Sequence, residues 1–249
     1  LIPMRNIKLT ISYDGTGYKG WQVQANGRTV QEELEGAIKK VFGGPHRVFA
    51  ASRTDAGVHA KGQAVNFKIP LALSVPADKI LLALNAHLPE EIAVRSAQET
   101  DLEFHSRFDA KRKHYKYCVL NSRHRDPFME KYAWRVPYSL DVPLMRKEAK
   151  ALLGKHDFKA FQARDKRERS SVRKIFKLSI AKKKSSLLID IEADGFLYNM
   201  VRNIVGTLVD IGRGYLPEGS MRKILKGRDR TQAGPTAPAK GLFLVEVKY

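Results

Sequence analysis

The chain has 249 residues, of which 43% are hydrophobic and 29% charged, and its 45 Lys and Arg residues exceed its 26 Asp and Glu residues by 19. This composition is typical of a globular protein and excludes disordered and collagen-like chains. The charge favours a polyanionic partner, and nucleic acid fits better than a membrane because no apolar stretch approaches the roughly 20 residues that span a bilayer. The single cysteine excludes an internal disulfide, and together with the lack of a secretory signal it indicates a cytoplasmic protein.

The first half of the chain alternates strand and helix patterns. Residues 7–13 alternate apolar and polar side chains, which predicts a half-buried strand. Thr29 and Glu32 form a capping-box signature ahead of apolar residues at helical spacing, and Gly43 with Gly44 ends that predicted helix. The patterns also predict strands at 48–51, 63–69, 92–96 and 111–120 and a helix at 76–86.

A stretch rich in proline and charge, residues 121–143, is the predicted junction between two domains, 4–121 and 144–249. Beyond it the patterns predict helices at 144–153, 196–211 and 220–226, a hairpin of 172–182 with 187–193, and a closing strand at 242–247. Since strands and helices are interspersed and the hairpin implies antiparallel pairing, the expected fold class is α+β. We expect two sheet-plus-helix, RRM-like halves that form a largely antiparallel, continuous sheet with an active-site cleft.

The segment with the most candidate chemistry is residues 51–59, in the loop between two predicted strands. Arg53 and Asp55 are two residues apart, so on extended backbone they lie on one face, where an ion pair would keep the carboxylate charged. An oriented carboxylate without a metal or a second acid suggests nucleophilic or base chemistry at a sugar carbon or a base. The plainer alternative is an Asx turn that ends at Gly57.

Other classes of function find less support in the residues. The His and Cys residues lack metal-ligand spacing, and neither a calcium loop nor a glycine-rich phosphate loop is present, so we expect no metal and no cofactor. A non-catalytic RNA-binding protein built from RRM-like halves would explain the charge equally well, but the RNP1 string that such domains carry is missing. A metal-dependent nuclease would need an acidic cluster that the sequence does not contain.

Residues 53–59, Arg-Thr-Asp-Ala-Gly-Val-His, resemble the signature of the tRNA pseudouridine synthase A family. Ser52 stands where the family usually has glycine, and serine would not easily replace a glycine whose φ is positive. His114 stands where an arginine often precedes the tyrosine. Further segments that resemble the family are residues 13–15, 20–24, 30–32, 85–89, 104–108, 115–117, 200–206 and 241–245.

The resemblance implies that the protein isomerises uridine to pseudouridine at positions 38, 39 and 40 of the anticodon arm of tRNA. It further implies a homodimer that needs no cofactor, no membrane and no other protein partner. Asp55 would be the catalytic aspartate and Arg53 its ion-pair partner. Tyr115 would stack on the uracil and could assist proton transfer, and Arg202 would reach toward the aspartate and hold the flipped base. Whether Asp55 bonds to C1′ or acts as a base at C2′ stays open.

The residue patterns allow these roles and also allow plainer ones. Tyr115 shares one face of its predicted strand with other apolar residues, so core packing is its alternative. Arg202 lies opposite the apolar stripe of its predicted helix, and Gly206 leaves a notch that RNA or a loop could enter. Trp21 could be a core residue or a stacking platform. Four basic clusters could hold tRNA phosphates, at residues 111–113, 164–169, 182–184 and 222–230.

Overall fold

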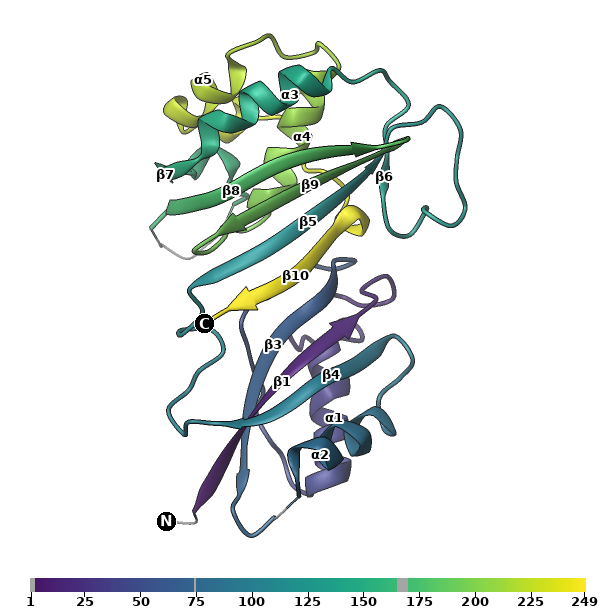
Figure 1. Ribbon diagram of the computed structural model, residues 1–249, viewed down its shortest axis with the longest axis vertical. Helices are drawn as coiled ribbons and strands as arrows, with labels where there is room; N and C mark the ends of the chain where they lie inside the picture. The colour runs from purple at the N-terminus through teal and green to yellow at the C-terminus, as the bar shows by residue number, and fades with distance from the viewer. Residues whose placement is uncertain (1–2, 74, 165–169) are drawn as a thin grey trace. The chain divides into compact units, whose positions relative to one another are not determined.

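The computed structural model describes residues 3–73, 75–164 and 170–249. The chain divides into two compact units (Figure 1): unit 1 comprises Leu1–Lys111 and Leu244–Tyr249, and unit 2 comprises Arg112–Phe243. This division differs from the expected one, because the predicted junction at 121–143 lies inside unit 2. The strand before that stretch, β5 (Arg112–Leu120), pairs along its length with β9 (Ser186–Ala193) and so belongs to unit 2.

Unit 1 is an antiparallel sheet covered on one face by two helices (Figure 1). Its strands lie in the order β4-β1-β3-β10, and β2 pairs with β3. The strands are β1 (Met4–Tyr13), β2 (Phe49–Ala50), β3 (His59–Pro70), β4 (Ile92–Thr100) and the end of β10 (Leu242–Lys248), and the helices are α1 (Val30–Phe42) and α2 (Ala77–Asn85).

Helix α1 forms as its sequence predicts. The Thr29 side chain accepts a hydrogen bond from the backbone N–H of Glu32 at 3.4 Å, which satisfies one of the donors that a helix start leaves unpaired. The helix buries Leu34 and Ile38 and ends at Phe42, before a glycine with φ of 72°. The Thr29 cap and the glycine stop are therefore confirmed.

The long strands of unit 2 are also antiparallel, and three α-helices lie on one side of them (Figure 1). Its strands lie in the order β5-β9-β8-β7, and the short β6 runs parallel to β5. Besides β5 and β9, the elements are β6 (Trp134–Arg135), α3 (Val142–Ala149), η1 (Lys150–Leu152), β7 (Gly154–Asp157), η2 (Lys159–Phe161), β8 (Val172–Lys183), α4 (Met200–Gly212), α5 (Ser220–Gly227), η3 (Arg230–Gln232) and η4 (Ala239–Gly241).

Asp157, at the end of β7, joins neighbouring segments of unit 2. It accepts hydrogen bonds from Ser171 Oγ at 2.6 Å and from the backbone N–H of Lys159 at 3.0 Å, and it forms an ion pair with Arg228 at 3.1 Å. Burial alone would raise the pKa of this carboxyl, but the hydrogen bonds and the nearby cations outweigh burial and lower it below its usual value.

The α+β class and the largely antiparallel sheets are confirmed. Helix α4 begins at Met200, four residues later than predicted, because Asn199 has a left-handed backbone with φ of 58° that cannot continue a helix. Strand β3 begins at His59 instead of residue 63, and β6 and β7 were not predicted because they are too short to show a pattern. Within the described part of the chain, every helix is too short or too polar to cross a membrane.

Candidate active site

The loop that carries Asp55 is fixed at its start by Gln63 of β3. The backbone N–H of Ser52 donates to Gln63 Oε1 at 3.2 Å, and Gln63 Nε2 donates to the carbonyl of Ser52 at 2.6 Å. Gln63 is fully buried, so this pair of bonds is shielded from water. Ser52 is not one of the residues with positive φ, so its presence in place of glycine causes no strain of that kind.

The middle of the loop is fixed at Thr54, directly before Asp55. Thr54 Oγ1 and Tyr13 Oη share a buried hydrogen bond of 2.7 Å, and the carbonyl of Thr54 accepts from the backbone N–H of Trp21 at 3.0 Å. Trp21 is 2% exposed, so it is a core residue and does not serve as a stacking platform. With its neighbour anchored from two sides, Asp55 has little freedom to shift along the chain.

The loop ends in a tight turn around Gly57. The N–H of Val58 donates to the carbonyl of Asp55 at 3.1 Å, and Gly57 has φ of 77°, a backbone that residues with a β-carbon rarely adopt. Gly15 packs directly against the turn, because a β-carbon on it would lie 2.1 Å from the carbonyl oxygen of Val58. His59 holds Gly15 in place by accepting its N–H at Nδ1 over 3.1 Å.

Asp55 itself is half-buried, whereas Arg53 is exposed. The three anchors therefore hold the backbone on both sides of a carboxylate that water or a ligand can reach. Such an arrangement suits a group that must meet a bound substrate in one orientation. The ion pair between Arg53 and Asp55 stays a prediction.

In unit 2, strand β5 presents Tyr115 as the alternation predicts. Tyr115, Tyr117 and Val119 are all buried on one face of the strand. The ring of Tyr115 packs edge-to-face against Phe196 with 5.1 Å between the ring centroids. Core packing is thus part of the role of Tyr115.

Arg202 of α4 and Tyr117 of β5 bind successive carbonyls of one loop. Arg202 Nε donates to the carbonyl of Ala237 at 2.7 Å, and Tyr117 Oη donates to the carbonyl of Pro238 at 2.7 Å. Burial raises the pKa of Tyr117, and the positive charge of Arg202 acts in the opposite direction, as expected for neighbouring groups. Tyr117 was not among the predicted site residues, although it lies two residues from Tyr115 on the same face of β5.

This loop, residues 230–238, is held to α4 by a polar network. Asn203, which is fully buried, accepts from Arg230 Nη2 at 3.0 Å and from Thr236 Oγ1 at 2.6 Å. The notch at Gly206 is occupied by the loop, because a β-carbon there would lie 1.7 Å from the carbonyl oxygen of Pro235. The sequence left either RNA or a loop as the occupant of this notch, and the occupant is the protein's own loop.

The model of the family described as tRNA pseudouridine synthase matches residues 9–109 and 149–249. The tRNA pseudouridine synthase A of Thermoanaerobacter sp. (strain X514) is 48% identical over 246 residues, which cover 99% of this chain and 100% of that protein. The chain belongs to the tRNA pseudouridine synthase family. Proteins of the same name from Geobacter sp. (strain M21), 46% identical over 247 residues, and Ruminiclostridium cellulolyticum, 44% identical over 247 residues, also match 99% of this chain and 99% and 100% of their own lengths.

The segments that match the family model include predicted site residues of both units. The first matched segment contains the aspartate loop with Arg53 and Asp55 in unit 1, and the second contains Arg202 in unit 2. Tyr115 lies between the matched segments but inside the region shared with the full-length relatives.

Two further sequence features are placed by the structure. His114, which stands where the synthases often have arginine, contacts Asp190 on β9 through Nε2 at 2.7 Å. The basic cluster at 164–169 falls mostly on residues 165–169, which lie outside the described residues. Among the residues that are described, no group of three or more His, Cys, Asp or Glu side chains could hold a metal ion.

Proposed function

We propose that this protein isomerises uridine to pseudouridine in tRNA, at positions 38, 39 and 40 of the anticodon arm. The observation that carries the proposal is the aspartate loop: a half-buried carboxylate whose flanking backbone is fixed by Gln63, Tyr13 and Gly15, in a chain whose curated relatives are named tRNA pseudouridine synthase A. The competing class, a non-catalytic RNA-binding protein, has no need for a carboxylate held in this way.

The reaction rearranges one nucleotide without changing its formula. The bond from C1′ to N1 breaks, the uracil rotates, and a bond from C1′ to C5 forms, while C5 releases its hydrogen to solvent and N1 gains a proton. Since no electrons or groups are transferred to a second molecule, the protein's own residues can account for the chemistry. Asp55 acts at the ribose, as a nucleophile at C1′ or as a base at C2′, and both routes need a charged carboxylate in a fixed orientation.

The other predicted site residues support Asp55 in this proposal. Arg53 pairs with the carboxylate and keeps it ionised at neutral pH. Tyr115 stacks on the uracil, which must leave the helical stack before it can rotate, and its hydroxyl assists proton transfer. Arg202, whose Nε is anchored on Ala237, helps hold the flipped base. We further propose that the protein acts as a homodimer, with one tRNA contacting both copies.

Mapping of the modified positions tests this proposal. An unmodified tRNA transcript with uridines at 38, 39 and 40 is incubated with the protein, and pseudouridines are located by carbodiimide-dependent stops in reverse transcription. We expect stops that report these three positions and none in a matched transcript with cytidines there. Stops only at other uridines would contradict the assignment to the anticodon arm, and an absence of stops would contradict the activity.

A further inference from the structure

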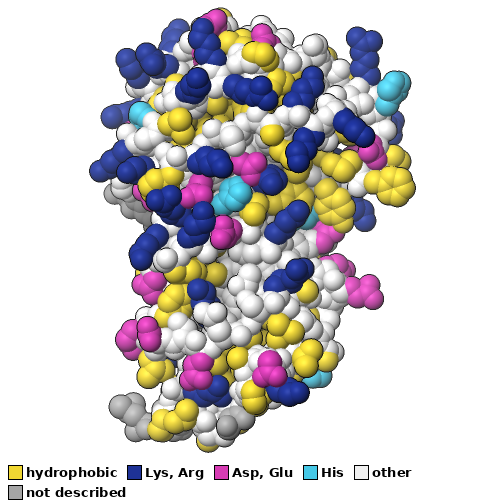
Figure 2. Space-filling view, in the orientation of Figure 1, with side chains coloured by type: hydrophobic (Ala, Val, Ile, Leu, Met, Phe, Trp, Pro, Cys, Tyr) yellow, Lys and Arg dark blue, Asp and Glu magenta, His cyan; other side chains and the backbone are white. Residues whose placement is uncertain are grey.

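The excess of basic residues belongs almost wholly to unit 2. The residues of unit 1 include 15 Lys and Arg against 13 Asp and Glu, an excess of two, whereas those of unit 2 include 30 against 13, an excess of 17. Figure 2 shows Lys and Arg side chains spread over the visible face of unit 2. A polyanion is therefore attracted chiefly to unit 2.

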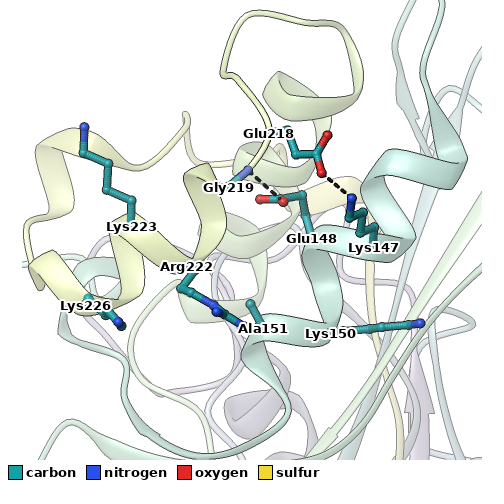
Figure 3. A pocket seen from close by; sticks show the side chains of 9 residues that line it. All are labelled: Lys147, Glu148, Lys150, Ala151, Glu218, Gly219, Arg222, Lys223 and Lys226. Atoms are coloured by element: carbon teal, nitrogen blue, oxygen red, sulfur yellow. Dashed lines mark hydrogen bonds and ion pairs between the residues drawn. The ribbon is translucent and has the colours of Figure 1, made fainter.

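Within unit 2, the helices form a basic groove of about 640 Å³ (Figure 3). One wall consists of the end of α3 with η1, and the other consists of α5 and the turn before it. Five of its nine lining residues are basic: Lys147, Lys150, Arg222, Lys223 and Lys226. We call this feature the α3–α5 groove.

The two acidic residues of the α3–α5 groove are already engaged. Glu148 is 6% exposed, and its two oxygens accept the backbone N–H groups of Gly219 at 2.9 Å and Met221 at 3.0 Å, which fixes the start of α5 against α3. Glu218 accepts a hydrogen bond from Lys147, and this bond raises the pKa of that lysine. Glu218 therefore compensates the charge of Lys147 alone.

The four other basic side chains of the groove keep an uncompensated charge. Among the described residues, no ion-pair partner is found for Lys150, Arg222, Lys223 or Lys226. Arg222 and Lys226 are four residues apart on α5, so their side chains lie on the same side of the helix, about one turn apart. Lys150 belongs to the opposite wall, but its side chain extends away from α5 (Figure 3), so Arg222 and Lys226 are the cations that a ligand in the groove would meet.

We propose that the α3–α5 groove binds phosphodiester groups of an RNA backbone. The nine lining residues include no aromatic side chain on which a base could stack, so the groove contributes affinity and position without reading sequence. The inference rests on the proposed function, because it takes the RNA to be tRNA. It adds a defined docking site on the helices of unit 2, separate from the residues proposed to act on the uridine.

The first test neutralises the groove. The double variant R222A/K226A is compared with K39A/K40A, which removes the same charge from two exposed lysines of α1 in unit 1. We expect the groove variant to lose about tenfold or more in tRNA affinity at physiological salt. Its plot of log affinity against log salt should be shallower than that of the wild type by about 1 to 2, because each lost phosphate contact removes about 0.7 to 0.9 from the slope.

The second test adds charge to the groove. The variant E218Q removes the acid that compensates Lys147, so we expect tighter tRNA binding and a steeper salt dependence than in the wild type. Both members of this ion pair are more than half exposed, so the substitution should leave folding intact. Damage to the fold would weaken binding, so tighter binding by E218Q cannot result from misfolding. Weaker or unchanged binding by E218Q would overturn the proposal.

Further comparisons distinguish binding of RNA phosphodiesters from binding of free phosphate and from a general effect of charge. If R222A/K226A and K39A/K40A weaken tRNA binding equally, the effect is one of general charge and the groove is not a site. If inorganic phosphate binds the wild type but not R222A/K226A, while both proteins bind tRNA with equal affinity, the groove takes free phosphate and the RNA assignment is wrong. An absence of pseudouridine formation in the wild type, with the groove effects present, would refute only the proposed function.

Discussion

Replacement of Asn203 by alanine should destabilise unit 2 by about 3.5 to 5 kcal/mol. The side chain is fully buried in α4, where its Nδ2 donates to the carbonyl of Phe161 at 2.8 Å and its Oδ1 accepts from Arg230 at 3.0 Å and Thr236 at 2.6 Å. A neutral hydrogen bond contributes about 1 kcal/mol and one to a charged group about 1.5 to 3 kcal/mol. Two of the former and one of the latter give the expected loss.

Urea unfolding followed by far-ultraviolet circular dichroism measures this loss. The matched control is Q98A on β4 of unit 1, which removes an exposed amide and should change the free energy of unfolding by no more than about 0.5 kcal/mol. Because the network around Asn203 also fixes the loop that binds Arg202, pseudouridine formation should fall in N203A. A loss below about 1 kcal/mol, or one equal to that of the control, would refute the network as the support of this loop.

Three other substitutions probe separate features. Tyr115→Phe keeps the packed ring and should leave tRNA affinity unchanged while it slows single-turnover pseudouridine formation; an unchanged rate would restrict Tyr115 to packing. Gly206→Ala places a β-carbon 1.7 Å from the carbonyl oxygen of Pro235 and should lower stability by about 2 kcal/mol or more. The control Gly36→Ala in α1, with nothing within 4 Å of the added carbon, should be neutral or stabilising. Equal melting temperatures of the two variants would disprove the contact with Pro235. The pKa of Asp157 is lowered by folding, so its contribution to stability is complete above the unfolded value of about 3.9 and is lost as pH falls through the lower folded value. The stability difference between wild type and Asp157→Asn, measured by urea unfolding between pH 3 and 7, should therefore be constant above about pH 5 and shrink below about pH 4, and a difference that grows in acid would contradict this sign.

Local chemistry made much of the fold predictable. The Thr29 cap, the alternation on β5 and the hairpin of β8 with β9 depend on residues close in sequence, and the structure contains all three. The late start of α4 was not predicted, because an asparagine can occur within a helix. Only the left-handed backbone of Asn199 shows that the helix begins after it. The boundary between the units escaped as well, since it depends on the pairing of β5 with a strand about 70 residues further along the chain.

In the candidate site, too, contacts between residues far apart in the sequence could not be predicted. The signature around Asp55 is visible in the sequence, but Gln63, which fixes the loop through two hydrogen bonds, shows no pattern that marks it. The network of Asn203 with Arg230 and Thr236 joins residues that are 27 and 33 positions apart, and no periodicity connects them. Such contacts depend on how segments pack, which local spacing does not encode.

Tritium release from tRNA labelled at C5 of uridine tests the central claim most directly, because the hydrogen on C5 leaves only when C5 bonds to C1′. With no cofactor added, the wild-type protein should release tritium. Asp55→Asn should release none above background while it binds tRNA with wild-type affinity, and the exposed control Asp101→Asn should behave as wild type. Release by Asp55→Asn at a rate near that of the wild type would contradict the role of Asp55.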